Sequence, residues 1–261
     1  MDNQADISTL TRSLLKKGKT NIRETLADKY IRGKGIEIGA LHQPMPVPKR
    51  AAQVRYVDRL DVDGLKTHYP ELGAFALVPV DIVDDGEKLN TFKDNSEDFI
   101  ITSHFLEHTQ DPIGTIKRHI EVLKPGGILF MAVPDKRYTF DVLRPNTNIE
   151  HFISDHENGP QPSYMDHVHE YVSLVDKLSG HEFDSKVEYI RSTNYSIHFH
   201  VWDADSMKAF VNTLLIQKYQ LPVKICSFVE NPANCECIFV LQKDQDGRPS
   251  GFWNRIRSFS I

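Results

Sequence analysis

The feature that most constrains the fold is a series of short, mostly apolar runs that recur between residues 34 and 134. None shows the strict alternation of polar and apolar residues that a half-exposed strand needs, so each predicts a strand buried on both faces. An amphipathic helical stretch, 112–123, precedes the last run and has a proline in its first turn. This alternation of strands and helices favours an α/β fold with a parallel sheet. The expected strands are 36–38, 53–57, 76–80, 98–102 and 128–133.

Residues 135–200 interrupt this rhythm. They contain Pro145, Pro160 and Pro162, and one clear apolar stripe between Met165 and Leu178 that predicts a helix. Because this stretch follows the fifth expected strand, we expect an insertion that covers the carboxyl edge of the sheet and contacts the acceptor.

The regular pattern returns after the insertion. Asp203 is expected to cap a helix whose apolar stripe begins at Met207, and strands follow at 223–228 and 236–241. The complete expectation is a Rossmann-like, doubly wound, mostly parallel sheet of seven strands with an insertion after the fifth. The expected divisions are an N-terminal helical segment at 1–30, a core domain at 31–243 and a C-terminal tail at 244–261.

Bulk composition disfavours some functions. The 261 residues carry a formal net charge of -5, which argues against a surface that tracks nucleic-acid phosphates. No apolar run reaches the length of about 18 residues that a membrane-spanning helix needs. The first ten residues are polar and acidic, unlike a secretory leader, and the three cysteines show no disulfide or zinc-ligand spacing. We therefore expect a cytoplasmic protein that acts on a small molecule or a glycan.

Acidic residues occur in or directly after three of the expected strands, at Glu37, Asp58 and Asp81. Since ligands of parallel sheets bind beyond the carboxyl ends of the strands, we expect these carboxylates to lie together. A nucleoside cofactor with a cationic amino-acid tail needs one carboxylate near its ammonium, a second for its ribose hydroxyls and a polar group for its adenine amine. Gly39 supplies the tight turn through which the backbone approaches such a ligand.

These residues resemble the motifs of class I S-adenosylmethionine-dependent methyltransferases. The run 37–40, Glu-Ile-Gly-Ala, is similar to a shortened form of their first motif, and Asp58 follows at the distance of their ribose-binding acid. Asp81-Ile82 resembles their adenine-side pair, and the segments 98–108 and 122–127 resemble those at their fourth strand and before their fifth. The resemblance implies a Rossmann-like fold and S-adenosylmethionine as cofactor. The cofactor-binding residues that it implies are Glu37, Gly39, Ala40, Asp58, Arg59, Asp81, Ile82 and Ser103.

The loop after Gly39 departs from the family pattern. The family usually has further glycines here, whereas this chain has Pro44, Pro46 and Pro48. Because a pyrophosphate needs bare backbone amides at a helix N-terminus, this loop argues against an NAD enzyme. The shortened motif also leaves open a non-catalytic Rossmann-like partner protein.

Methyl transfer to a sugar hydroxyl needs a general base or a metal ion that lowers the pKa of the hydroxyl. His104, just past the fourth expected strand, is the first candidate base. His104, Glu107 and His108 also resemble a pattern implicated in metal binding in ubiquinone-type O-methyltransferases. A divalent metal therefore stays open, and the alternative is that Glu107 and His108 orient the following helix.

The insertion supplies the remaining candidates. His151 and Asp155 share a face if their stretch is helical, and they are candidate catalytic residues. His198 and His200 are expected on one side of an extended segment, either in a structural role or in contact with the acceptor. The candidate acceptor-binding residues are Arg137, Tyr138, Arg144 and His167.

The segment that begins at Pro134 with the run Pro-Asp-Lys-Arg-Tyr resembles methyltransferases of bacterial surface-polysaccharide biosynthesis. This resemblance implies O-methylation of a sugar or glycan hydroxyl. Methylation of a phenol, a quinone or an amine is the alternative activity. Methylation of DNA bases is disfavoured, because the Asn/Asp-Pro-Pro-aromatic motif of such enzymes does not occur.

Overall fold

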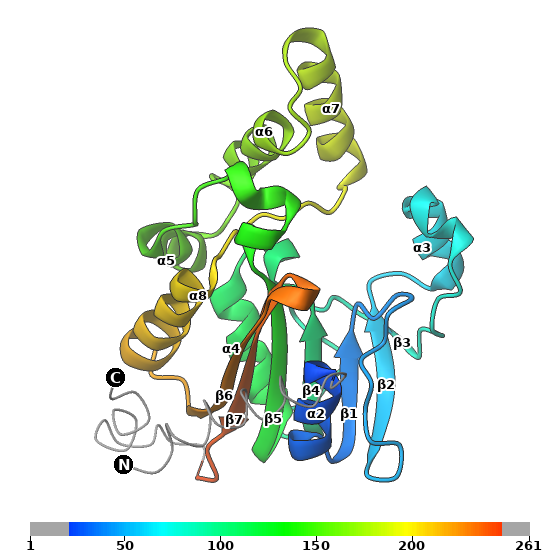
Figure 1. Ribbon diagram of the computed structural model, residues 1–261, viewed down its shortest axis with the longest axis vertical. Coiled ribbons are helices and arrows are strands. Elements are labelled where there is room, and N and C mark those ends of the chain that lie inside the picture. Colours follow the sequence, from blue (N-terminus) through cyan, green and yellow to red (C-terminus); the bar gives the residue numbers. More distant parts are fainter. Residues whose placement is uncertain (1–20, 247–261) are drawn as a thin grey trace.

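The computed structural model describes residues 21–246, which fold around one seven-stranded sheet with helices on both faces (Figure 1). The strand order is β3-β2-β1-β4-β5-β7-β6. The first five strands pair in parallel, and β7 is antiparallel to both β5 and β6. The sheet is therefore doubly wound and mostly parallel, as predicted. The strands are β1 (Gly33–Ile38), β2 (Ala52–Asp58), β3 (Ile82–Val83), β4 (Glu97–Ser103), β5 (Leu123–Pro134), β6 (Val223–Asn231) and β7 (Glu236–Lys243).

The central strands are buried on both faces, which explains their continuous apolar runs. In β4, Ile100 faces a cluster that includes residues of α4 and α8, whereas Phe99 and Ile101 face a cluster that includes α2. The α-helices are α2 (Ile22–Tyr30), α3 (Val62–His68), α4 (Pro112–Val122), α5 (Ile149–Asn158), α6 (Tyr164–Leu174), α7 (Gly180–Thr193) and α8 (Ala204–Ala209). The other helical segments are η1 (Pro70–Ala74), η2 (Leu106–His108), η3 (Lys136–Tyr138), η4 (Phe140–Leu143), η5 (Phe210–Lys218) and η6 (Pro232–Asn234).

Aspartates cap the starts of two helices. The carboxylate of Asp111 accepts a hydrogen bond from the backbone N–H of Gly114, and Pro112 occupies the first turn of α4. The carboxylate of Asp203 accepts from the N–H of Ser206, whose hydroxyl in turn accepts from the N–H of Asp203. The predicted cap at Asp203 is confirmed. The helix continues without a break into the π-helical segment η5.

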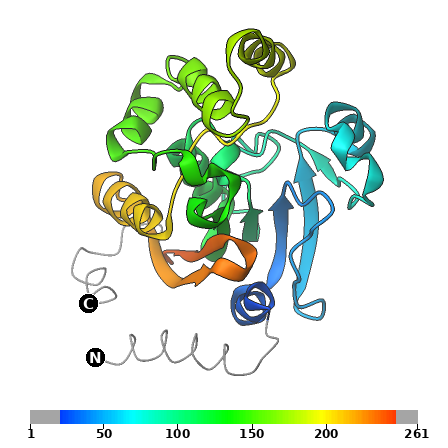
Figure 2. The same ribbon diagram turned by 45° about the horizontal axis from the view of Figure 1, so that its top comes forward.

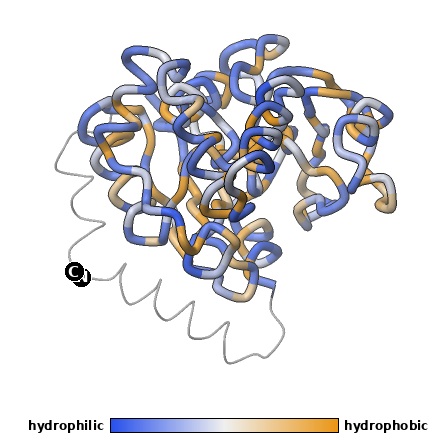
Figure 3. Tube along the Cα trace, turned by 90° about the horizontal axis from the view of Figure 1, so that it is seen from above, coloured by the Kyte–Doolittle hydropathy of each residue, from blue (hydrophilic) through white to orange (hydrophobic). Residues whose placement is uncertain are grey.

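Helices α5, α6 and α7 form a cap that lies beyond the carboxyl ends of the parallel strands (Figure 2). The cap has an apolar cluster of its own, in which Val168 and Val172 of α6 pack with Val187 and Ile190 of α7. The insertion at 135–200 thus covers the carboxyl edge of the sheet, as expected. Seen from that side, hydrophobic and hydrophilic stretches alternate along the chain, as expected for helices with one buried face (Figure 3).

The third strand is not where the sequence predicted it. Residues 76–80 form no strand, and the two residues of β3, Ile82 and Val83, pair with the last two residues of β2. The N–H of Val78 donates to the carbonyl of Leu41, and Pro79 has no N–H to give to a ladder, so this apolar run passes beyond the sheet.

Other differences concern the helices. Within the predicted 1–30 segment the structure describes α2, whereas residues 1–20 lie outside the described part of the chain, as does the tail from 247 onward. In the insertion, α6 ends at Leu174, and α7 was not predicted because it buries only Val187 and Ile190. No helix between residues 21 and 246 is long and apolar enough to cross a membrane.

Candidate active site

Two adjoining cavities open at the carboxyl edge of the sheet, where the strand order reverses between β1 and β4. The Asp58 cavity, of about 350 Å³, is lined by Asp58 and Arg59 after β2 and by Asp85–Glu87 after β3. The Arg23 cavity, of about 400 Å³, is lined by Arg23 of α2, Ala40 and Ser103. Both cavities share Gly39, Leu41 and His104.

Two glycines shape the wall between the sheet and the Asp58 cavity. Gly39 has a φ of +68°, which lets the chain turn sharply at the end of β1. A Cβ at Gly86 would lie 2.6 Å from the side chain of Ile38 and 2.8 Å from that of Phe105, so only glycine fits there. The loop after β3 therefore approaches the ends of β1 and β4 closely.

Asp58 lies where a ribose-binding carboxylate is needed. It ends β2 half-buried in the cavity wall, and its Oδ1 accepts a hydrogen bond from the N–H of Arg59 at 2.7 Å. Burial raises the pKa of Asp58 to about 6, despite hydrogen bonds from the backbone of Arg59 and Leu60. The Arg59 side chain is held away by the Tyr69 hydroxyl at 2.6 Å and by His68. These residues fit a nucleoside.

Asp81 does not lie at this cavity, contrary to the sequence prediction. Because β3 begins at Ile82, Asp81 precedes that strand, is exposed, and accepts a hydrogen bond at 2.8 Å from the N–H of Tyr56. Neither Asp81 nor Ile82 lines either cavity of the described chain; Asp85, Gly86 and Glu87 line the wall instead. Burial and the charge of Asp85 raise the pKa of Glu87 to about 7. The signal missed in the sequence was the Asp-Asp-Gly-Glu run after the true third strand.

Glu37 holds the loop after β1. Its side chain is buried, and both carboxylate oxygens accept from the N–H of Met45, at 2.9 and 3.1 Å. Burial raises the pKa of Glu37 to about 7, although the Met45 hydrogen bond and the charge of Arg23 oppose this. Among the described residues Glu37 is not part of either cavity wall, so the structure gives its carboxylate a loop-fixing contact in place of the predicted ammonium site.

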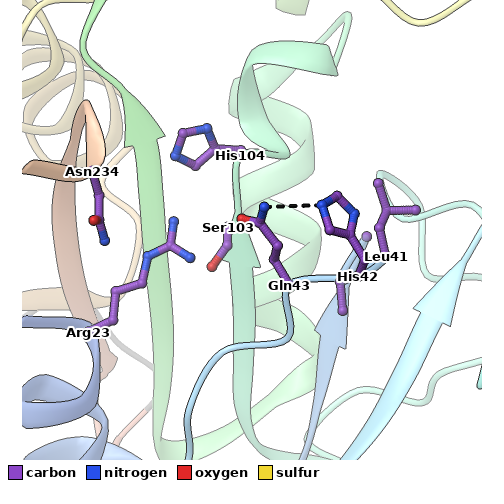
Figure 4. A pocket seen from close by; sticks show the side chains of 9 residues that line it. Arg23, Leu41, His42, Gln43, Ser103, His104 and Asn234 are labelled. Carbon is purple, nitrogen blue, oxygen red and sulfur yellow. Dashed lines mark hydrogen bonds between the residues drawn. The ribbon is translucent and has the colours of Figure 1, made fainter. Parts of the chain in front are cut away.

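Arg23 and His104 line the Arg23 cavity (Figure 4), and both contact Glu236 behind them in an ion-pair network that sequence patterns did not predict. Nε of Arg23 donates to Oε1 of Glu236 at 3.0 Å, and Asn231 donates to the same oxygen at 2.7 Å. Although burial opposes it, hydrogen bonds from His104, Arg23 and Asn231 lower the pKa of Glu236 to about 2. Ser103 lines the cavity with a buried hydroxyl that has no hydrogen-bond partner between residues 21 and 246.

His104 lies between the two cavities with a φ of +51°. Its Nε2 is 3.1 Å from Oε2 of Glu236, and its Nδ1 is 3.9 Å from Oε1 of Glu107. Burial would lower the pKa of His104, but the hydrogen bond to Glu236 and the charges of both glutamates outweigh burial and raise it above 6.5. His104 is thus the one predicted catalytic residue that the structure puts at the cavities.

The possible metal-ligand group contains Glu107, His108 and His198 and not the predicted His104, although Nδ1 of His104 also lies 3.9 Å from Glu107. Oε1 of Glu107 is 4.0 Å from Nε2 of His108 and 3.9 Å from Nε2 of His198. The outer ring nitrogens are occupied, since His108 contacts the Ile197 carbonyl at 2.9 Å and His198 contacts Asp141 at 2.6 Å. Both buried oxygens of Glu107 lack a hydrogen-bond partner in the described chain, so this group has the donor set for a cation.

The prediction that Arg144 binds the acceptor is wrong. Its side chain is fully buried, and it donates to Asp141 at 2.9 Å, to Glu170 at 2.8 Å and to the carbonyl of His198 at 2.8 Å. Phe199 supplies a further carbonyl. Arg144 therefore ties the turn η4 to α6 and to the segment that carries His198.

The other predicted residues of the insertion fall into two groups. Arg137 is half-exposed and pairs with Asp135 and Glu230, and Tyr138 beside it is 45% exposed. His151, Asp155 and His167 do come together, but their cluster lines neither cavity described here.

Comparison with known proteins agrees with this arrangement. Residues 33–213 match the model of a methyltransferase-domain family. No curated protein matches the chain. A solved structure titled as a putative zinc-dependent alcohol dehydrogenase from Rhodobacter sphaeroides is 16% identical, with 87% of this chain and 91% of that chain covered and a TM-score of 0.52. At this identity the likeness concerns the fold alone.

Two further structures carry methyltransferase titles. A SAM-dependent methyltransferase from Methanosarcina mazei is 15% identical over 81% of this chain and 92% of its own, with a TM-score of 0.41. One from Aquifex aeolicus is 12% identical over 93% of both chains, with a TM-score of 0.40. The family match covers well over half of the chain, and the residues at the sheet edge fit a nucleoside cofactor. The chain belongs to the methyltransferase-domain family and is a class I S-adenosylmethionine-dependent methyltransferase.

Proposed function

We propose that the protein O-methylates a hydroxyl group of a sugar or glycan, with His104 as the general base. The observation that carries the proposal is the pairing of His104 with Glu236 at the border of the two cavities. S-adenosylmethionine supplies, when bound, a methyl group on a positively charged sulfur, so the reaction is an in-line displacement that depends on alignment.

The two cavities divide the cofactor between them in this proposal. Asp58 would accept hydrogen bonds from the ribose hydroxyls, and the wall at Asp85–Glu87 would face the adenine. The amino-acid tail would extend past Gly39 toward Ser103, whose hydroxyl is unpaired within the described chain, and Arg23 would offer a cation to the tail carboxylate. The reacting methyl group would then lie near His104, which both cavities share.

The hydrogen bond to Glu236 sets the tautomer of the proposed base. Because a carboxylate only accepts, Nε2 of His104 carries the proton in this contact and Nδ1 keeps a free lone pair. Nδ1 would take the proton of the acceptor hydroxyl while the acceptor oxygen bonds to the methyl carbon and the carbon–sulfur bond breaks. The imidazolium that results is stabilised by Glu236 and by Glu107, 3.9 Å from Nδ1.

A histidine base that two glutamates stabilise favours an aliphatic alcohol over a phenol as the acceptor. A phenol, with a pKa near 10, ionises far more readily than an aliphatic hydroxyl, which needs the base in the transition state. Tyr138 and Phe140 add exposed aromatic surface on η3 and η4 that a sugar ring can stack on. The resemblance of the segment after β5 to methyltransferases of surface-polysaccharide biosynthesis points the same way.

A divalent ion held by Glu107, His108 and His198 is the alternative means of activating the hydroxyl. The two mechanisms differ in their response to chelation. Activity carried by His104 alone survives extensive dialysis against EDTA, whereas activity carried by an ion at this group is lost and returns when the ion is added back.

Transfer assays with labelled S-adenosylmethionine test the proposal. The acceptors would include sugar nucleotides and oligosaccharides, with catechols and aryl amines as the competing classes. We expect methylated sugar, and a fall in kcat of roughly 10²- to 10⁴-fold for His104→Gln, with cofactor affinity unchanged. His181→Gln, on the exposed face of α7, is the matched control. Methylation of phenols or amines alone would refute the acceptor class, and an unaltered kcat for His104→Gln would refute the base.

A further inference from the structure

We infer that three histidines and one aspartate of the cap form a binding site for a transition-metal ion, for which Zn²⁺ is the best fit. They are His151 and Asp155 of α5, His167 of α6, and His200 in the extended segment between α7 and α8. One ligand atom from each residue lies within 4.8 Å of the other three. None of the four lines the Asp58 cavity or the Arg23 cavity, so within the described chain this site is separate from the cofactor cleft.

The separations between these atoms suit a tetrahedral site. Nε2 of His151 lies 2.9 Å from Nε2 of His167 and 3.1 Å from Oδ2 of Asp155. The same Oδ2 lies 3.8 Å from Nε2 of His167 and 3.6 Å from Nε2 of His200. With metal–ligand bonds of about 2.0–2.1 Å, neighbouring atoms of a tetrahedral shell are about 3.3 Å apart. The observed distances lie on both sides of that value.

Asp155 is the clearest indication that a ligand is needed. It is 2% exposed, and its Oδ2 forms no hydrogen bond of acceptable geometry within residues 21–246, although three imidazoles surround it. The nearest group, Nε2 of His151 at 3.1 Å, can pair with this carboxylate only when the imidazole is protonated, whereas a bound cation would stabilise the buried charge directly. The other oxygen, Oδ1, accepts from the hydroxyl of Ser163 at 2.7 Å, which aims Oδ2 at the histidines. Outer-shell contacts of this kind orient the ligands of metal sites.

The three imidazole rings are placed as ligands around one point. The ring of His167 is nearly perpendicular to those of His151 and His200, at 85° and 79°, and His151 and His200 cross at 71°. Nε2 of His200 also lies 3.4 Å from the carbonyl of Gln110, longer than an ordinary N–H···O bond. That weak contact leaves the nitrogen available to an ion.

The donor set indicates the ion and its role. Imidazole nitrogens suit Zn²⁺ and its neighbours in the first transition series, and four protein ligands are typical of structural zinc sites, which keep no position open for substrate. An ion here would join α5, α6 and the segment of His200, which are far apart in the sequence. His151 keeps 29% of its side chain exposed and gives the ion a route from solvent.

Metal binding by the full chain tests the inference. The protein would be stripped with a chelator, then titrated with Zn²⁺ against a chromophoric competitor and with Co²⁺, whose visible absorption reports tetrahedral coordination. We expect one ion per chain in the wild type. The ligand variants Asp155→Asn and His167→Gln should weaken zinc binding by at least 10- to 100-fold, the loss that outer-shell changes already cause. His169→Gln, an exposed histidine on the same helix, is the matched control and should bind as the wild type does.

Two outcomes overturn the inference. One is a wild-type protein without stoichiometric zinc binding. The other is a tightly bound ion that Asp155→Asn retains, above all if Glu107→Gln loses it, because the ion then belongs to Glu107, His108 and His198. Ser163→Ala keeps all four ligands and should lose part of the affinity, which gives a second readout if a ligand variant fails to fold. None of these measurements requires methyl transfer, so they are independent of the proposed acceptor.

Discussion

The carboxyl edge of the sheet and the cap that covers it use charged side chains differently. At the sheet edge, Asp58, Glu87 and His104 border open cavities, and burial or neighbouring carboxylates raise the pKa of each. In the insertion that carries the cap, Arg144 and Asp141 are buried and paired. Arg144 donates to Asp141, to Glu170 and to backbone carbonyls, and the carboxylate of Asp141 also contacts His198. Charges at the edge are kept available for ligands, whereas this buried pair fixes the shape of the insertion. The following substitutions test that division.

The largest effect is expected from Arg144→Ala. The substitution leaves Asp141 buried with one partner fewer and removes the tie between η4 and α6, which should lower the free energy of unfolding by about 3–5 kcal/mol. Urea denaturation followed by circular dichroism measures it. Arg191→Ala, on the exposed face of α7 in the same cap, should leave the denaturation midpoint unchanged. Equal midpoints for the two variants would show that burial does not distinguish these arginines.

A smaller effect, dependent on pH, is expected from Glu37→Gln. The pKa of Glu37 is raised from 4.5 to about 7 in the folded chain, so the folded state holds the proton more tightly than the unfolded state. The stability that this contributes is present below about pH 4.5 and is lost as the pH rises through 7, by up to ~3 kcal/mol.

The glutamine of this variant would stay neutral throughout, so the variant should gain stability relative to the wild type between pH 5 and pH 8 in the absence of cofactor. Thermal denaturation at both pH values measures the difference. A constant offset between the two proteins would mean that the Glu37 carboxyl does not titrate in this range.

The smallest effect is expected from Tyr138→Ala. Stacking of an exposed ring contributes about 0.5–1.5 kcal/mol, so the KM for a sugar acceptor should rise roughly 2- to 10-fold without a change in cofactor affinity. Steady-state kinetics at saturating cofactor measure this. An unchanged KM would show that the acceptor does not stack on Tyr138 of η3.

The sheet and much of its edge could be predicted because parallel strands bring their carboxyl ends to one place. Gly39, Asp58 and His104 each follow or end a strand, and the structure puts all three at the cavities. The prediction for Asp81 was wrong because the apolar run before it is not a strand, since Pro79 cannot join a ladder. The acid that lines the cavity comes four residues later, at Asp85.

Residues brought together only by tertiary structure could not be predicted. Arg23 and Glu236 are 213 positions apart, and they meet because β7 runs antiparallel beside β5. The first residue of β7, Glu236, therefore pairs with the last residue of β5, Pro134, at the edge where the parallel strands end. Likewise, no pattern in the insertion distinguishes the buried Arg144 from the half-exposed Arg137.

Calorimetric titration of the wild type, Asp58→Ala and Asp81→Ala with S-adenosylmethionine would show whether the cofactor binds at Asp58. We expect the wild type and Asp81→Ala to bind the cofactor equally, because Asp81 contacts the backbone of Tyr56 outside the cavity. Asp58→Ala should bind about 10- to 100-fold more weakly, as expected for the loss of hydrogen bonds to a charged acceptor. Binding that Asp81→Ala loses, or that Asp58→Ala retains in full, would contradict this placement of the cofactor.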